Sequence, residues 1–248
     1  MLEYIAIFVL GLLVGSFLNV CIYRIPRGET VITNPSHCLA CHTRIKPWDL
    51  VPVASFLVLG GRCRYCDTRL SWQYPLVELA TGILYLTALW KWGVGWETLA
   101  MLVFFSMLLV VTVIDLYHQI IPNRVLLVSG VLGLPLIYLQ SFEMLKTGTI
   151  GFFVAGTLLF IIAVASKGGM GGGDIKLAAV MGMFLGLKLV MIALFLAFLI
   201  GGIIGIILLA TGQKGRKDPI PFGPFLALGS LIAALVGEKI ISWYTGFW

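Results

Sequence analysis

Two aspartates, Asp115 and Asp174, differ from the other three in the chain because each adjoins a long apolar stretch. Asp49, Asp67 and Asp218 lie instead in polar, charged segments. An ionisable group beside a membrane span is costly to bury, which makes it a candidate functional residue. If the two carboxyl groups meet, they can form a dyad in which one is ionised and the other is protonated. The two aspartates are therefore candidates for a carboxylate dyad.

Asp174 lies in the glycine-rich stretch Lys167 to Lys176, which reads Lys-Gly-Gly-Met-Gly-Gly-Gly-Asp-Ile-Lys. Glycine lets a backbone unwind and approach another segment closely, and irregular backbone at membrane depth requires a protein-lined, wet cavity. We therefore expect Gly171 and Gly173 to keep the backbone open for substrate and water. Lys176 either contacts this site or anchors the chain at the membrane interface. In a simpler interpretation, Asp174 only caps the following helix.

Four cysteines form two C-x2-C pairs separated by 21 residues, namely Cys38, Cys41, Cys63 and Cys66. This spacing is typical of zinc-ribbon sites. Four thiolates around Zn²⁺ leave no open position for water, so the ion would have a structural role and would fold a segment that has little core of its own. The alternative is four reduced cysteines in a loop that other contacts hold together.

The composition is that of a membrane protein, because 60% of the 248 residues are hydrophobic, only 11% are charged, and the mean hydropathy is +1.03. We predict an all-α polytopic fold of about eight transmembrane helices with a small cytoplasmic zinc-ribbon-like loop domain. No internal repeat is apparent. The apolar segments recur at about 4–23, 75–90, 97–114, 125–141, 149–166, 176–187, 189–210 and 221–244.

The basic residues predict the orientation of the spans. Arg24 and Arg27 follow the first apolar segment and no base precedes it, which argues against a cleaved signal peptide. Most of the 17 Lys and Arg residues fall in loops on that same side, which predicts an outside N-terminus and a cytoplasmic location for the cysteines and both aspartates. The net charge of +6 is confined to these loops, and no aromatic-basic surface indicates nucleic acid as a partner, so membrane lipid is the expected surrounding.

Five sequence blocks, in order, resemble the type IV prepilin peptidases. Asp115, with the Ile-Pro-Asn downstream of it, is similar to one aspartate motif of that family. Asp174, in its G-x-G-D sequence, is similar to the other. The G-x-G-D signature is shared with presenilin-like intramembrane proteases. The cysteine pairs resemble the family's cytoplasmic loop. The remaining two blocks are Gly15-Ser-Phe-Leu-Asn19-Val-Cys-Ile-Tyr-Arg24-Ile-Pro26 and Ser71-Trp-Gln-Tyr-Pro75-Leu-Val-Glu78.

The resemblance implies a bifunctional enzyme of the bacterial cytoplasmic (inner) membrane. Such enzymes cleave the leader of type IV prepilins or pseudopilins after a glycine at the cytoplasmic face, and then methylate the new N-terminus with S-adenosylmethionine. The resemblance also implies three regions: a first transmembrane helix at 1–23, a four-cysteine loop domain at 24–74 and a seven-helix membrane domain at 75–248. The loop domain forms the methyltransferase region with its adjoining helices. The seven-helix domain carries the protease aspartates.

The candidate methyltransferase residues are Asn19, Arg24 and Glu78, because they are polar groups near the cytoplasmic ends of the first two helices. Each has a structural alternative: Asn19 bonds between helices, Arg24 snorkels to the interface, or Glu78 pairs with a base. For the whole chain, a rival interpretation is an ion-coupled transporter that binds ions or protons at Asp115 and Asp174. A third is a membrane-bound redox or zinc-scaffold protein.

Overall fold

The computed structural model describes residues 1–32, 35–166, 169–215 and 218–246, so Lys167 lies outside the described residues. The described part is all-α, as predicted, and holds no strand beyond two isolated bridges. The chain divides into two compact units, Met1–Val94 and Gly95–Trp248. The cysteines belong to the first unit and both membrane-adjacent aspartates to the second.

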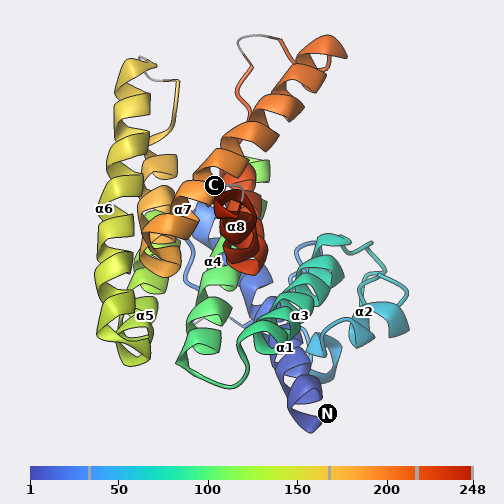
Figure 1. Cartoon of the computed structure of the whole chain (residues 1–248). Coiled ribbons are helices and arrows are strands. Elements are labelled where there is room, and N and C mark those ends of the chain that lie inside the picture. The colour runs from blue at the N-terminus through green and yellow to red at the C-terminus, as the bar shows by residue number, and fades with distance from the viewer. Residues whose placement is uncertain (33–34, 167–168, 216–217, 247–248) are drawn as a thin grey trace. The chain divides into compact units, whose positions relative to one another are not determined.

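The first unit pairs two long helices, α1 (Leu2–Arg24) and α3 (Gln73–Trp92), which pack side by side (Figure 1). Gly15 of α1 allows the close approach, because a Cβ there would lie 2.7 Å from the Cα of Glu78. Between the two helices the chain forms irregular loops and the short elements η1 (Ile25–Arg27), η2 (Pro47–Leu50) and α2 (Ala54–Val58).

The described residues of the second unit form five helices, α4 (Trp96–His118), α5 (Asn123–Gln140), α6 (Phe142–Ala165), α7 (Gly172–Ala210) and α8 (Gly223–Thr245). Helix α7 is central, since it packs against all four others. Phe104 of α4 stacks on Phe184 of α7 with ring centroids 4.9 Å apart, and both side chains are buried. The core of this unit therefore joins α4 to the first half of α7.

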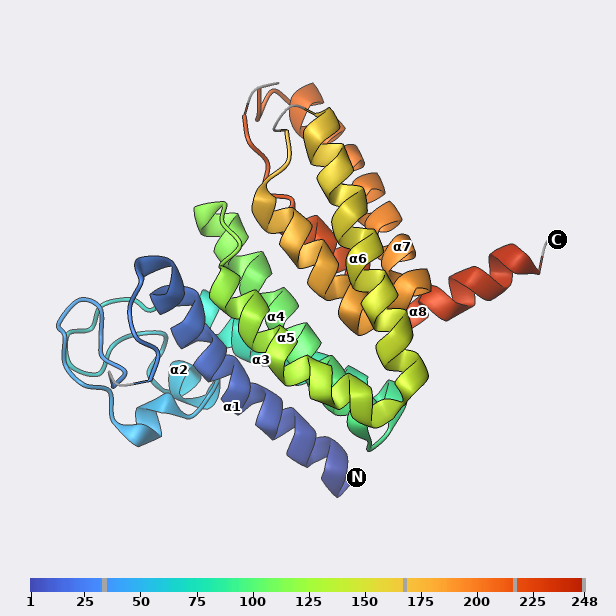
Figure 2. The same ribbon diagram turned by 90° about the vertical axis from the view of Figure 1, so that its left-hand side faces the viewer.

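Among the described residues, six helices are long and apolar enough to cross a membrane: α1, α4, α5, α6, α7 and α8. Helix α3 has 20 residues and matches the predicted segment at 75–90. The 39 residues of α7 contain the predicted segments 176–187 and 189–210, separated at Gly186, whose φ of 72° and ψ of 172° are not helical. Figure 2 shows the two halves of α7 running in nearly opposite directions. All eight predicted segments are thus present.

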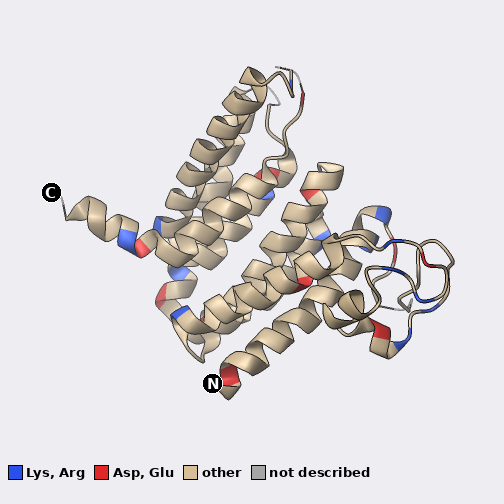
Figure 3. Ribbon diagram, turned by 90° about the vertical axis from the view of Figure 1, so that its right-hand side faces the viewer, with Lys and Arg blue, Asp and Glu red and all other residues tan. Residues whose placement is uncertain are grey.

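Charged residues are sparse along the long helices and gather at helix ends and in the loops around α2 (Figure 3). Ionisable groups are expensive inside a bilayer and are tolerated at its edges. The few acids near the ends of apolar helices must therefore be stabilised by their surroundings.

Candidate active site and cysteine module

Asp115 lies near the C-terminal end of α4 and is only 5% exposed. Its Oδ2 accepts a hydrogen bond of 2.9 Å from the N–H of Gly223, the first residue of α8. The free N–H groups and the dipole at a helix N-terminus favour negative charge. The start of α8 thus fixes the Asp115 carboxyl group and satisfies one of its oxygens.

Asp174 is the third residue of α7 and is partly buried. Its Oδ2 accepts a 3.2 Å hydrogen bond from the N–H of Gly171, and its own N–H donates to the carbonyl of Gly171 at 3.1 Å. Asp174 therefore caps its own helix, as the simpler interpretation expected. A carboxylate that accepts one N–H retains further lone pairs for water or substrate, so capping leaves the chemistry open.

The segments that carry the two aspartates are joined by two contacts. A Cβ on Gly173 would lie 2.9 Å from the Cβ of Ile121, so only glycine lets the start of α7 approach the α4–α5 connection this closely. Lys176 donates from Nζ to Oδ1 of Asn123 at 3.0 Å. The structure thus brings the segments that carry the two aspartates into direct contact.

The predicted neighbours of this site have defined positions. Gly171 and Gly173 lie beside it, and Lys176 donates a hydrogen bond to Asn123. Gly223 was not singled out from the sequence. A signal was nevertheless present, because it lies between two prolines in Pro-Phe-Gly-Pro at the start of an apolar segment.

The four cysteine sulfurs of the first unit form one cluster, in which all four lie within 4.8 Å of one another. None of the five cysteines, all of which lie in the described part of the chain, forms a disulfide. The Sγ atoms of Cys38 and Cys66 are 3.8 Å apart, and a tetrahedral zinc site with Zn–S bonds of about 2.3 Å has edges of about 3.8 Å. The donor set therefore fits a structural Zn²⁺ ion.

Each cysteine pair forms the same local turn. The N–H of Cys38 donates to the carbonyl of Thr43 at 3.0 Å, and that of Cys63 donates to Thr68 at 2.9 Å. His42 and Asp67 occupy equivalent positions with φ of 55° and 58°. The two segments form a structural repeat, although none was recognised in the sequence. The signal was the shared pattern Cys-x-x-Cys-x-Thr-Arg at 38–44 and 63–69.

Hydrogen bonds to the sulfurs favour the thiolates that zinc requires. The N–H groups of Tyr65 and Cys66 lower the pKa of Cys63. The hydrogen bond between Sγ of Cys66 and the Thr68 hydroxyl group, 3.3 Å long, lowers the pKa of Cys66. The second turn thus favours the thiolate form at two of the four sulfurs.

An ion pair braces the cysteine module from outside. Arg64 binds Asp49 through two nitrogens, with Nη2 2.6 Å from Oδ1 and Nε 3.0 Å from Oδ2. This interaction lowers the pKa of Asp49. The Asp49 side chain is only 5% exposed, so η2 is fixed to the second cysteine turn.

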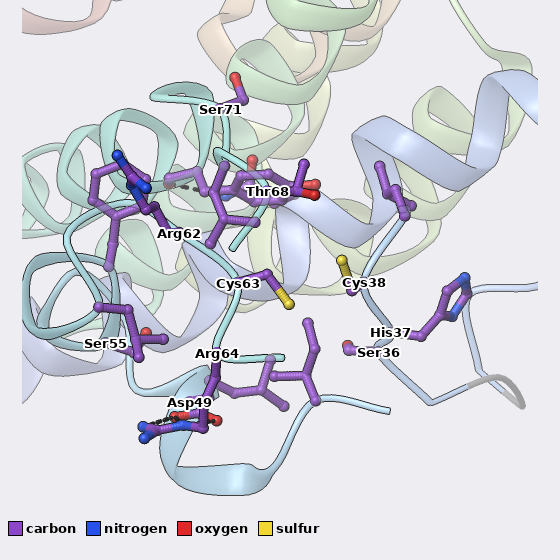
Figure 4. Close-up of a pocket in the computed structure, with 18 of the residues that line it drawn as sticks. Ser36, His37, Cys38, Asp49, Ser55, Arg62, Cys63, Arg64, Thr68 and Ser71 are labelled. Atoms are coloured by element: carbon purple, nitrogen blue, oxygen red, sulfur yellow. Dashed lines mark hydrogen bonds and ion pairs between the residues drawn. The ribbon is translucent and has the colours of Figure 1, made fainter. Parts of the chain in front are cut away.

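A cavity of about 390 Å³ lies within the first unit, between the cysteine turns and the facing parts of α1, α2 and α3. Cys38 and Cys63 line it with their sulfurs directed inward (Figure 4). The three candidate methyltransferase residues, Asn19, Arg24 and Glu78, also line the cavity. Residues that are distant in the sequence thus share one cavity, of a size within the range of about 300–1,000 Å³ usual for small-molecule sites.

These three side chains are all buried and hydrogen-bonded. Asn19 donates to the backbone carbonyl of Tyr74 at 3.1 Å and so links the two long helices, as its structural alternative expected. Arg24 is 5% exposed and donates to the carbonyls of Thr30 and Pro35, which folds the chain after α1 instead of extending toward solvent. Glu78 accepts a hydrogen bond from the N–H of Val53 and forms no ion pair in the described part of the chain.

The fold and these sites define a polytopic helical membrane protein with two aspartates at the ends of apolar helices in one unit and a four-cysteine module in the other. Residues 9–92 match the bacterial peptidase A24 N-terminal domain, and residues 102–206 match the type IV leader peptidase family. The chain belongs to the type IV leader peptidase family.

Curated relatives cover almost the whole chain. A prepilin leader peptidase/N-methyltransferase of Bacillus subtilis is 37% identical over 242 residues, covering 96% of both chains. A protein of the same name from Pseudomonas aeruginosa is 35% identical, over 96% of this chain and 92% of the relative. One from Legionella pneumophila is 36% identical, over 99% of this chain and 95% of the relative. No solved structure matches the chain.

Proposed function

We propose that this protein cleaves the leader of type IV prepilin-like substrates after a glycine, with Asp115 and Asp174 activating water, and then methylates the new N-terminus. The single observation that carries the proteolytic part is the junction of the two aspartate segments, through Gly173 against Ile121 and through the Lys176–Asn123 hydrogen bond. Family membership supports the same activity.

The chemistry requires two protonation states in the pair. One carboxylate removes a proton from water, and the resulting hydroxide attacks the scissile carbonyl. The other carboxyl group, still protonated, polarises that carbonyl and then protonates the leaving amine. Partial burial and the like charge of the neighbour favour this unequal state, because two adjacent carboxylates in a low dielectric do not both ionise cheaply.

The substrate we propose is another membrane-inserted chain, a prepilin or pseudopilin, with an apolar helix and a basic leader. The excess of bases in the loops on one side favours a cytoplasmic position for the aspartates, with the N-terminus outside. In the bacterial cytoplasmic membrane, acidic groups at that face would attract the basic leader.

The methylation we propose takes place in the first unit. The cavity supports this, because it is of small-molecule size and is lined by aromatic rings, by Asn19 and by the carboxylates of Asp49 and Glu78. S-adenosylmethionine supplies a methyl group from its sulfonium to the neutral N-terminal amine, which afterwards releases a proton. The task of the protein is to orient the donor and exclude water.

The test uses purified full-length protein, a prepilin and S-adenosylmethionine, with the products weighed by mass spectrometry. The wild type should shorten the substrate by its leader and add one methyl group. Asp115→Asn and Asp174→Asn should each abolish cleavage while the protein stays folded, and Asp218→Asn, which alters an exposed loop, is the matched control. Full cleavage by either of the first two variants would remove that carboxylate from the mechanism.

The same experiment separates the rival interpretations. An ion-coupled transporter or a redox scaffold leaves the prepilin unchanged in mass. Family membership gives no support to transport, whereas it supports peptide cleavage.

A further inference from the structure

A strained turn precedes α2 in the first unit. Val53 has φ of 61° and ψ of −51°, and the N–H of Ala54 donates to the carbonyl of Pro52 at 2.6 Å. These are the dihedrals and the hydrogen bond of a classic γ-turn, which is rare and strained. A β-branched residue at positive φ adds to the strain. Such conformations persist only where the surroundings hold them, and they cluster at functional sites.

The carboxylate of Glu78 holds this turn. Its Oε2 accepts a 2.7 Å hydrogen bond from the N–H of Val53. Glu78 is 7% exposed, and hydrogen bonds to a charged acceptor are stronger than those between neutral groups. One side chain of α3 thus connects this helix to the turn.

The turn determines the position of one wall of the cavity. Val53 is the N-cap of α2, which spans only five residues, so its location depends on how it is anchored. Phe56 of α2 is 7% exposed and packs on Trp72 with ring centroids 4.9 Å apart. Ser55, Phe56 and Leu59 all line the cavity. A shift of the turn would therefore move this wall.

We propose that Glu78 is a positioning residue whose carboxylate holds the Val53 γ-turn, and with it the α2 wall of the cavity, in the arrangement that accepts the methyl donor. This inference rests on the proposed function for its ligand, S-adenosylmethionine. It assigns to Glu78 a positioning role instead of that of a base for the substrate amine, because the contact that the structure shows for its carboxylate is to the N–H of Val53 at the turn.

The geometry offers a suppressor. The dihedrals of Val53 are the mirror image of an allowed region, so glycine adopts them without strain. Val53→Gly should therefore remove the need for the carboxylate. Val51→Gly is the matched control, because Val51 has an ordinary extended conformation with φ of −63° two residues earlier.

The experiment measures binding of labelled S-adenosylmethionine, methylation kinetics and leader cleavage on the full-length protein. Glu78→Ala should weaken donor binding and raise its KM about tenfold or more, as loss of a hydrogen bond to a charged group implies, while kcat at saturating donor and leader cleavage stay near wild type. Glu78→Gln should retain most binding, because its amide oxygen still accepts. Val53→Gly should restore binding to Glu78→Ala, whereas Val51→Gly should not.

Hydrogen exchange of residues 51–59 provides a readout that needs no ligand. Exchange should rise in Glu78→Ala and fall again when Val53→Gly is added. If exchange is unchanged, or if Glu78→Gln loses kcat as fully as Glu78→Ala and Val53→Gly gives no rescue, Glu78 acts chemically and the inference is overturned. If wild-type protein binds no S-adenosylmethionine while exchange behaves as expected, the proposed methylation fails and the positioning of the turn stands.

Discussion

The N–H of Gly223 donates to Oδ2 of Asp115 across 2.9 Å, which joins residues 108 positions apart in a buried contact. The first residue of α8 is thereby part of the surroundings of an aspartate at the end of α4. A backbone donor cannot be replaced by a change of side chain. The identity of residue 223 nevertheless matters, because the contact leaves no room for a side chain.

Gly223→Ala should disable leader cleavage. A Cβ at this position would lie 2.7 Å from Oδ2 of Asp115, so the carboxylate must move. Displacement of a catalytic group by about 1 Å costs roughly a hundredfold in rate, and we expect kcat/KM for cleavage to fall by about that factor. Gly202→Ala is the control, since a Cβ there meets nothing within 4 Å. A Gly223→Ala enzyme with wild-type kcat/KM would show that this contact does not position Asp115.

Lys176→Met and Asn123→Leu should impair cleavage through the same contact. Loss of an exposed hydrogen bond between these side chains is expected to lower kcat/KM about three- to tenfold in either variant. The double variant should be no worse than the poorer single variant, because both changes remove one interaction. Lys188→Met tests for a simple effect of charge, since Lys188 is also exposed in this unit. Additive losses would mean that the two residues act separately.

Cys66→Ser should release zinc and impair methylation. Metal analysis of the wild type is expected to find about one zinc per chain, because four thiolates fill a structural site. Removing one ligand or adding a chelator should expose residues 36–70 to protease, since such sites contribute folding energy. Leader cleavage should persist, because the two aspartates lie in the other compact unit. The control is Cys21→Ala, which alters a cysteine outside the cluster. Retention of zinc by Cys66→Ser would contradict the four-sulfur site.

Gly186→Ala should destabilise the second unit. The φ of 72° and ψ of 172° at this break in α7 belong to a region that essentially only glycine adopts, and a residue with a Cβ pays about 1–3 kcal/mol there. We expect a lower midpoint of thermal unfolding in detergent. Gly205→Ala should be neutral or slightly stabilising, because that glycine is helical and a Cβ on it meets nothing within 4 Å. An unchanged midpoint for Gly186→Ala would show that α7 tolerates a continuous helix here.

The sequence by itself determined the class of the protein, the apolar segments, the four cysteine ligands and the two unusual aspartates. These features are local: a membrane span is a run of apolar residues, a metal-binding turn is a short spacing of cysteines, and an acid beside a span is visible from its neighbours. Even the repeat of the cysteine turns was present in the residues at 38–44 and 63–69, although only the matching hydrogen bonds made it evident.

Only the tertiary structure determined which residues contact one another. Asp115 meets Gly223, Lys176 meets Asn123 at a separation of 53 residues, and Glu78 holds a turn 25 residues earlier in the chain. It also placed the break between the two predicted segments of α7 at Gly186 and showed that the chain reverses direction there. Such contacts depend on how whole helices pack and where loops return, and hydropathy and residue spacing carry no information about either.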